Sequence, residues 1–181
     1  MKSKRMLAML LSVLLCLGLS ACGGGGGGSS SPEAVVAKAV SAFENNSAKD
    51  LVSITSGVIT SMERYKGDKL LDHYQDYIDD IIKGSRFFLG DEAVKSISFE
   101  IEDFDTLSGQ EFDAAIEKLH RISGADDDLI DTITQISTPM SVHLEFMGAE
   151  GRTGGYTWKG FTLVNEKGGW KLLPYDFDDE D

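Results

Sequence analysis

His143 and Glu145 are the residues whose types and spacing come nearest to acid–base chemistry. They alternate with Val142 and Leu144, so an extended strand places both on its polar face. An imidazole and a carboxylate on one face could exchange protons with a substrate if the sheet curved around a hollow. On an open face the same pair would be solvated, and we therefore assign no catalytic residue.

Three aromatic residues follow within the next predicted strand. Tyr156 and Trp158 share one face of that strand, and Phe161 continues the apolar pattern. These rings could line a ligand hollow, or they could belong to the core, where large aromatic side chains contribute most to burial. The candidate pocket of the sequence consists of His143, Glu145, Tyr156, Trp158 and Phe161.

No motif for a metal or a cofactor is recognised. His73 and Asp76 lie one helical turn apart, which also suits a solvated helix face. The acidic runs 126–128 and 176–181 lack the glycine turn and the ligand spacing of a calcium loop. The glycines within 148–155 do not follow a nucleotide-binding spacing. We expect neither a metal nor a cofactor.

The cysteines lie at the start of the chain. Three basic residues precede an apolar stretch at 6–19, which has the length of a signal-peptide core and is too short to span a membrane. Cys16 lies within that stretch, so Cys22 would be the one cysteine left after export. An exported chain with one cysteine requires an explanation other than an internal disulfide.

The explanation is local. The run Leu19-Ser20-Ala21-Cys22 resembles the lipobox of bacterial lipoproteins. The resemblance implies cleavage between Ala21 and Cys22 and attachment of a diacylglyceryl group to the Cys22 thiol. Two acyl chains anchor a protein stably, whereas one is marginal. We therefore expect an exported protein that is anchored to the cell membrane, on its extracytoplasmic side, through lipidated Cys22.

Charge narrows the range of partners. The formal net charge is −13, and the loss of residues 1–21, which include three basic and no acidic residues, makes it −16. Such a surface repels phosphate backbones and anionic headgroups. We expect no nucleic-acid partner, and we expect the membrane to be contacted through the lipid alone. The charge is compatible with a protein partner or with a homodimer, and both remain hypotheses.

The chain divides into four parts. Residues 1–21 are the predicted signal peptide, and 22–31 are the lipidated cysteine with a Gly/Ser tether. Residues 32–175 are long enough for one globular domain with its own core. Residues 176–181 form an acidic tail.

Helices are predicted in the first half of the domain. Ser31 and Pro32 suit the start of a helix whose Val36, Val40 and Phe43 share one face. A second helix should open at Ser47 and continue to Met62. A third should begin at Asp68, carry the apolar positions Leu70, Leu71, Tyr74, Ile78, Ile81 and Ile82, and end at Gly84.

Strands dominate the second half. Alternation over 97–101 predicts a half-buried strand, and a capping box at Ser108 and Glu111 predicts another helix. The stretch 129–136 is ambiguous between helix and strand. Runs at 140–146, 156–164 and 170–175, joined by short turns, predict an antiparallel meander. Arg152, in the first of these turns, is expected to be simply exposed.

Helices followed by an antiparallel sheet indicate the α+β class, with the helices covering one face. The opening run 31–36 and the closing hairpin, which contains Phe161-Thr162-Leu163-Val164 and Gly169-Trp170-Lys171-Leu172, resemble the ends of small exported lipoprotein domains. Those domains have the cone-shaped fold of the nuclear transport factor two and cystatin type. The resemblance implies a curved sheet wrapped around a helix, and such domains include enzymes, ligand binders and dimerising modules.

Two functions follow as hypotheses. The first is a membrane-tethered, non-enzymatic binding or interaction module. The alternative is a small-molecule enzyme or pocket protein of the cone fold, for which the fold resemblance is the sole motive. A hollow between helices and sheet would favour the alternative, and a packed core would favour the first.

Overall fold

The computed structural model describes residues 29–122 and 124–174. The helices are α2 (Pro32–Glu44), α3 (Ala48–Ile54), α4 (Gly57–Ser61), the 3-10 turn η1 (Glu63–Tyr65), α5 (Lys69–Leu89), α6 (Gln110–Arg121) and α7 (Asp127–Ile130). The strands are β1 (Val94–Asp103), β2 (Ile133–Ile136), β3 (Met140–Gly148), β4 (Thr153–Glu166) and β5 (Gly169–Leu173).

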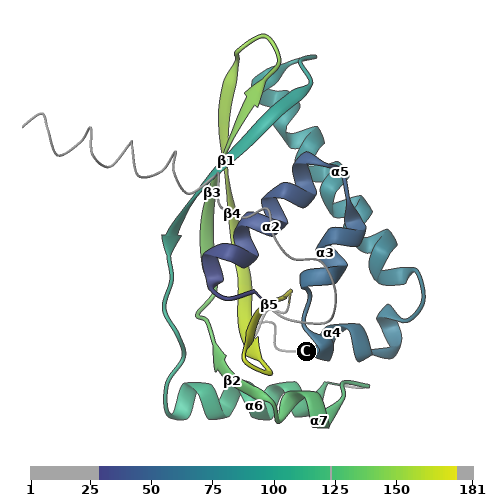
Figure 1. The fold of residues 1–181 in the computed structure, drawn as a ribbon, viewed down its shortest axis with the longest axis vertical. Coiled ribbons are helices and arrows are strands. Elements are labelled where there is room, and N and C mark those ends of the chain that lie inside the picture. Colours follow the sequence, from purple (N-terminus) through teal and green to yellow (C-terminus); the bar gives the residue numbers. More distant parts are fainter. Residues whose placement is uncertain (1–28, 123, 175–181) are drawn as a thin grey trace, which may run out of the picture.

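The long strand β4 organises the sheet. Its first part, from Thr153 to Phe161, pairs with β3, and β3 pairs in turn with β1. Its last part pairs with β5 on one side and with β2 on the other. All of these pairings are antiparallel, so the predicted meander is confirmed as β3-β4-β5 (Figure 1).

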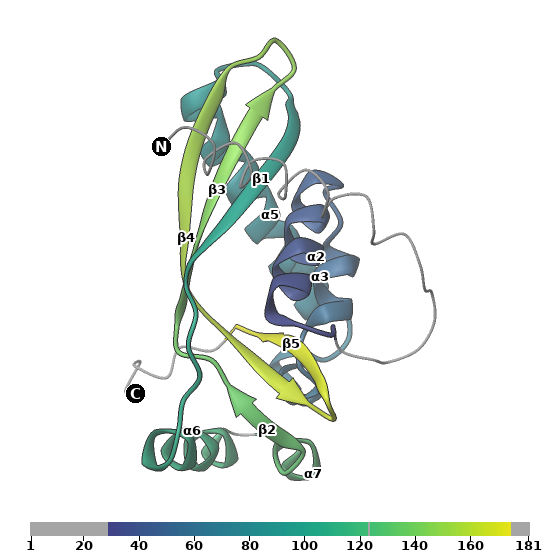
Figure 2. The same ribbon diagram turned by 60° about the vertical axis from the view of Figure 1, so that its left-hand side comes forward.

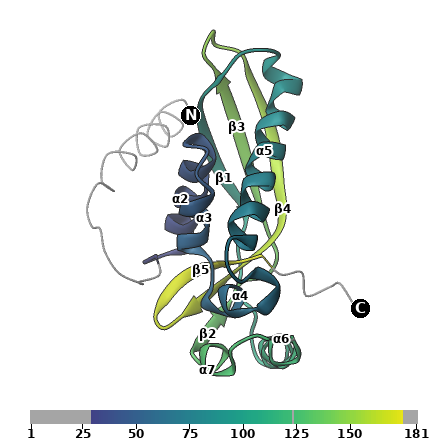
Figure 3. The ribbon, with the colours of Figure 1, turned by 90° about the vertical axis from the view of Figure 1, so that its right-hand side faces the viewer.

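The helices α2, α3 and α5 lie on one side of the β1-β3-β4 sheet (Figure 2). A view from the side shows α5 running along the sheet (Figure 3). The predicted α+β class, with N-terminal helices packed on a curved antiparallel sheet, is confirmed. The core is formed by the inward apolar faces, which include Val36, Val40 and Phe43 of α2, Ile78 of α5, and Val142, Leu144 and Phe146 of β3. Helices α6 and α7 lie with β2 at the opposite end from the β3–β4 turn (Figure 1).

The first helix forms as predicted. The Ser31 hydroxyl accepts a 3.3 Å hydrogen bond from the backbone N–H of Ala34, and Pro32 occupies the first turn. This satisfies one of the free N–H groups at the helix start. The apolar face of α2 is buried, as its spacing predicts.

The second predicted helix is wrong as one continuous element. Ser47 caps α3, since its hydroxyl accepts from Asp50 N at 3.4 Å, but the helix ends at Ile54. Thr55 is extended and forms a parallel bridge with Leu172 of β5. Ser56 then opens the separate helix α4. A tertiary pairing with β5 therefore overrides the continuous helical pattern.

The third helix is longer than predicted. It passes through Gly84 and ends five residues later, before Gly90, whose φ of 66° is accessible to glycine at little cost. Gly84 faces open space within α5. Leu71, predicted to face inward, is 38% exposed, and Asp68 forms no side-chain cap.

Two further predictions are resolved. The helix after Ser108 forms as α6, but it begins after Gly109 and no side chain caps it, so the predicted capping box is wrong. The ambiguous stretch 129–136 contains both elements, because α7 ends at Ile130 and β2 begins at Ile133.

The domain includes residues assigned above to the tether. Ser29 and Trp170 exchange two backbone hydrogen bonds of 2.9 Å. The predictions for the signal peptide, for Ala21 and Cys22, and for the acidic tail 176–181 lie outside the described residues. Within the described ranges, no helix is both long enough and apolar enough to cross a membrane.

Candidate binding site

The five residues of the candidate pocket do not meet at one site. In the β3–β4 register His143 stands opposite Thr157 and Glu145 opposite Gly155, whereas Trp158 stands opposite Val142 on the buried face. His143 and Glu145 therefore lie on the face of the sheet that the helices leave uncovered. The His143 ring lies over Gly155, where a Cβ would come within 2.7 Å of Cε1.

The other members of the candidate pocket belong mainly to the core. The rings of Trp158 and Phe161 stack with a centroid separation of 4.0 Å, and both side chains are buried. Phe43 of α2 packs edge-on against Trp158 at 5.3 Å, and Tyr77 of α5 lies 6.3 Å from Trp158. Aromatic rings thus fill the space between helices and sheet at this level. Tyr156 is the exception, with 48% of its surface exposed.

Burial affects the tyrosines of this core. Desolvation raises the pKa of Tyr77 above its usual value, and the neighbouring Tyr156 and Tyr74 raise it further. A hydrogen bond with Trp158 offsets part of that rise. Desolvation likewise raises the pKa of Tyr74, whose hydroxyl lies 2.7 Å from Thr55 Oγ1. Both hydroxyls therefore stay protonated at neutral pH.

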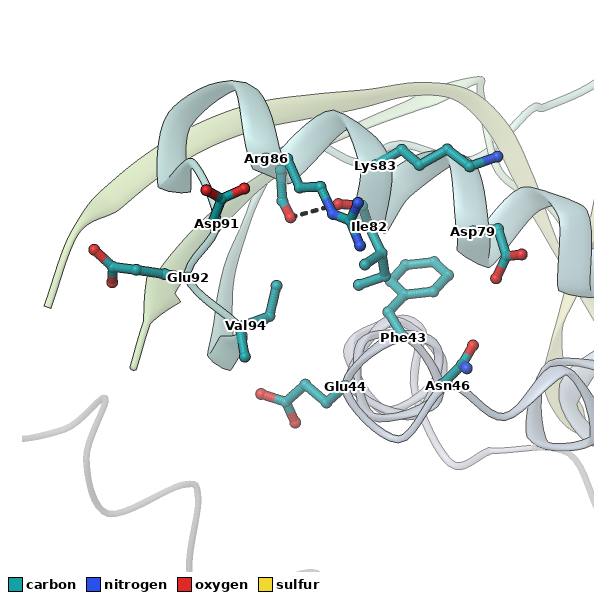
Figure 4. A pocket seen from close by; sticks show the side chains of 12 residues that line it. Phe43, Glu44, Asn46, Asp79, Ile82, Lys83, Arg86, Asp91, Glu92 and Val94 are labelled. Atoms are coloured by element: carbon teal, nitrogen blue, oxygen red, sulfur yellow. Dashed lines mark hydrogen bonds between the residues drawn. The ribbon is translucent and has the colours of Figure 1, made fainter. Parts of the chain in front are cut away.

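A cavity of about 630 Å³ opens elsewhere, where the end of α2 faces the second half of α5 and the approach to β1. We call it the α2–α5 cavity (Figure 4). Its apolar wall consists of Phe43, Ile82, Ala93 and Val94. Its polar wall consists of Glu44, Asn46, Asp79, Lys83, Ser85, Arg86, Asp91 and Glu92. The volume is in the range of ligand sites, whereas the wall is more polar than that of most such sites, which are lined mainly by apolar side chains.

Two chain reversals create this cavity. After α2 the chain turns at Asn46, which has a φ of 50°. After α5 it turns at Gly90, and residues 91–94 return beside α5 to enter β1. The Arg152 guanidinium fixes the second turn by donating a 3.3 Å hydrogen bond to the carbonyl oxygen of Leu89. Arg152 is exposed as expected, with 63% of its side chain accessible, and it also has this structural role.

Most acidic groups around the cavity already have partners. Glu44 Oε1 accepts a 2.7 Å hydrogen bond from the backbone N–H of Ile97. Glu92 has a side chain that is only 5% exposed; its Oε2 accepts from Glu150 N at 3.0 Å. Glu92 Oε1 lies 3.1 Å from Arg152 Nε, close enough for an ion pair but without the alignment of a hydrogen bond.

The basic groups differ from one another. Lys83 Nζ lies 3.4 Å from Asp80 on the same helix, in an exposed pair. Arg86 projects from α5 into the cavity (Figure 4) and forms no side-chain hydrogen bond or ion pair within residues 29–122 and 124–174. Asp91 likewise has no side-chain partner in those ranges. The cavity therefore presents a guanidinium and a carboxylate that are both available to a ligand.

The sequence analysis missed this cavity. Its wall comes from three separate segments, at 43–46, 79–86 and 91–94. The sequence of each segment alone is typical of a solvated helix end or loop, and no known motif relates the three segments by their spacing. Among the described residues, no group of three or more His, Cys, Asp or Glu side chains could hold a metal ion.

Comparisons of the chain with protein-family models, with curated proteins and with solved structures find no match. The resemblance of the domain ends to the cone fold, and that of residues 19–22 to a lipobox, accordingly stay predictions.

Proposed function

We propose that the protein is a lipid-anchored, extracytoplasmic binding module whose ligand occupies the α2–α5 cavity. The observation that carries the binding role is the cavity itself, with an unpaired guanidinium and an unpaired carboxylate beside an apolar wall. A few polar groups that are free to contact a ligand fix its orientation in a site. The proposed anchor is Cys22, because the run 19–22 has the lipobox pattern.

The proposed tether is short. Since Ser29 already pairs with Trp170 of β5, six glycines (Gly23–Gly28) separate it from Cys22. Even a fully extended segment of six residues reaches only about 20 Å. The domain would therefore work close to the membrane surface, where a short tether keeps it near any ligand that crosses or leaves that membrane.

Fractionation of cells that express the whole chain tests the anchor. Wild-type protein should be recovered in the membrane fraction and released by detergent, whereas Cys22→Ser should be unprocessed or soluble. Cys16→Ser, which changes the other cysteine, should behave as the wild type. A processed, membrane-bound Cys22→Ser product would refute the anchor.

A thermal-shift screen of the detergent-extracted protein against a metabolite panel tests the binding role. A ligand should raise the unfolding temperature of the wild type by preferential binding to the folded state, and it should do so less for Arg86→Ala. Ligands whose effect is the same in Arg86→Ala would place the binding site elsewhere and remove the cavity from the proposal.

A further inference from the structure

The charges in the α2–α5 cavity restrict the class of ligand. Four carboxylates line it, from Glu44, Asp79, Asp91 and Glu92, and two basic side chains, from Lys83 and Arg86. Arg152, outside the wall, neutralises Glu92. The remaining balance is slightly negative, so an anion that is not accompanied by a positive group would be repelled by the wall.

A cation alone fits no better. Arg86 projects into the cavity without a carboxylate partner, so a bound cation would face an unpaired guanidinium (Figure 4). Lys83 adds a second positive charge at the rim, although Asp80 partly neutralises it. A ligand with one positive and one negative group can pair with a carboxylate of the wall and with the Arg86 guanidinium.

The acceptors for a positive group are also identifiable. Asp91 has no other partner in the described ranges. Glu44 uses Oε1 for the Ile97 N–H, which leaves Oε2 available. Asp79 accepts one 3.1 Å hydrogen bond from Gln75 Nε2 and retains further acceptor sites. Glu44, Asp79 and Asp91 lie at different sides of the cavity, and Asp91 is the one on the side of Arg86 (Figure 4). A single ammonium group would therefore use Asp91.

The apolar part of the wall sets the remaining requirement. Phe43 is already buried, with 1% exposure, so the apolar surface open to a ligand comes mainly from Ile82 and Val94, which are half-buried. A ligand that contacts these residues gains by covering apolar surface. The volume of about 630 Å³ suits a molecule between one amino acid and a short peptide in size.

We infer that the α2–α5 cavity binds a small zwitterion with an apolar side chain, an α-amino acid or a short peptide. Its carboxylate is held by Arg86, and its ammonium group by Asp91, which lies on the same side of the cavity as Arg86 (Figure 4). The planar guanidinium can bind a carboxylate through two parallel hydrogen bonds, which a point charge such as lysine cannot do. This inference rests on the proposed binding function and names the ligand class of the same site.

Isothermal titration of the detergent-extracted protein tests the inference with matched compounds. The panel consists of leucine, dileucine and trileucine, together with leucinamide, which lacks the carboxylate, and N-acetylleucine, which lacks the ammonium group. At least one zwitterion should bind, and the analogue lacking either charge should bind at least about tenfold more weakly. The order of affinity among leucine, dileucine and trileucine distinguishes a free amino acid from a peptide.

Variants then assign the contacts. Arg86→Ala should weaken binding of the zwitterion about 10- to 100-fold and should leave leucinamide binding unchanged. Asp91→Asn should weaken binding of ligands that carry the ammonium group and should leave binding of N-acetylleucine unchanged. Arg121→Ala, which removes a comparable arginine from α6 outside the cavity wall, should bind as the wild type does.

The outcomes separate the two proposals. Equal binding of leucinamide and leucine, or unchanged affinity in Arg86→Ala, overturns the zwitterion inference. If no panel compound binds while a different metabolite binds in an Arg86-dependent manner, the ligand class is wrong and the binding function stands. If no metabolite binds at all, both fail.

Discussion

Glu166 Oε2 accepts a 2.7 Å hydrogen bond from the hydroxyl of Ser56, a residue 110 positions earlier in the chain. The same oxygen accepts from the backbone N–H of Gly57 at 2.8 Å, and Lys171 Nζ lies 3.0 Å from Oε1. The Glu166 side chain is 1% exposed and that of Lys171 is 15% exposed. The buried Glu166 carboxylate thus joins the start of α4 to the β4–β5 hairpin, because its partners come from both elements.

Glu166→Gln should destabilise the protein by about 3 kcal/mol, because removal of one member of a buried ion pair leaves the other uncompensated. The free energy of unfolding from urea titration measures the effect. The matched control is Glu117→Gln, which breaks an exposed pair with Arg121 and should change stability by about 0.5 kcal/mol or less. Equal effects of the two substitutions would mean that the Glu166 network adds nothing to stability.

Two glycines in helices should respond oppositely to alanine. At Gly57 a Cβ would lie 2.9 Å from both Glu166 Oε1 and Leu129 Cδ1, so Gly57→Ala should cost about 1–3 kcal/mol by overpacking. At Gly84 a Cβ meets nothing within 4 Å, so Gly84→Ala should stabilise α5 by about 0.5–1 kcal/mol. Urea unfolding of both variants distinguishes them, and stabilisation by Gly57→Ala would contradict the close approach.

Trp158→Ala should destabilise the protein by about 3–5 kcal/mol, since it removes a ring that is stacked on Phe161 and packed against Phe43. Tyr156→Ala, two residues earlier on the same face of β4 but 48% exposed, should have a much smaller effect. Thermal unfolding followed by circular dichroism compares the two. A mild effect of Trp158→Ala would mean that the rings line a hollow and are not packed core.

Alkaline pH should destabilise the fold through Tyr74 and Tyr77. Burial raises the pKa of both hydroxyls in the folded state above the usual value of about 10, so the folded protein holds these protons longer than the unfolded chain does. Their contribution is fully present below about pH 10 and is lost as the pH rises toward the folded-state values. Each tyrosine contributes a slope of about 1.4 kcal/mol per pH unit in that window.

Tyr77→Phe should reduce the slope of stability against pH above pH 10, because one of the two titrating groups is gone. Urea midpoints measured between pH 8 and pH 11 check this. Tyr65→Phe, in the half-buried turn η1, is the comparison variant; Tyr65 raises the pKa of Tyr74 but is not a cause of the Tyr77 shift, so the slope should change less. An unchanged slope in Tyr77→Phe would show that its hydroxyl titrates equally in both states.

Some predictions from local signals hold and others are wrong. Pro32 and Ser31 mark the start of α2, and the alternation of Val142 and Leu144 marks β3, because caps and side-chain period act within a few residues. The same local rules placed a helix end at Gly84. In the structure the apolar face continues past that glycine to Leu89, and burial of this face outweighs the preference of one glycine.

What depends on contacts across the chain could not be predicted. In the sequence, Glu166 is a polar residue next to a turn. Its hydrogen bond with Ser56 could not be predicted, because the two residues are 110 positions apart. The α2–α5 cavity is similarly invisible, since its wall joins a helix end near Asn46 to a return segment near Asp91. The candidate pocket failed for a related reason: alternation shows that His143 and Trp158 lie on faces of their own strands, but pairing register decides whether those faces coincide.

The division of β4 between partners has a consequence for the cooperativity of unfolding. Thr153 to Phe161 complete the half of the sheet with β1 and β3, and Thr162 to Glu166 complete the half with β2 and β5. If this one strand detaches, β2 and β5 lose the strand with which they pair, and β3 keeps only β1. The two halves should therefore open together as a single foldon, with the paired amides of β4 among the slowest to exchange with deuterium.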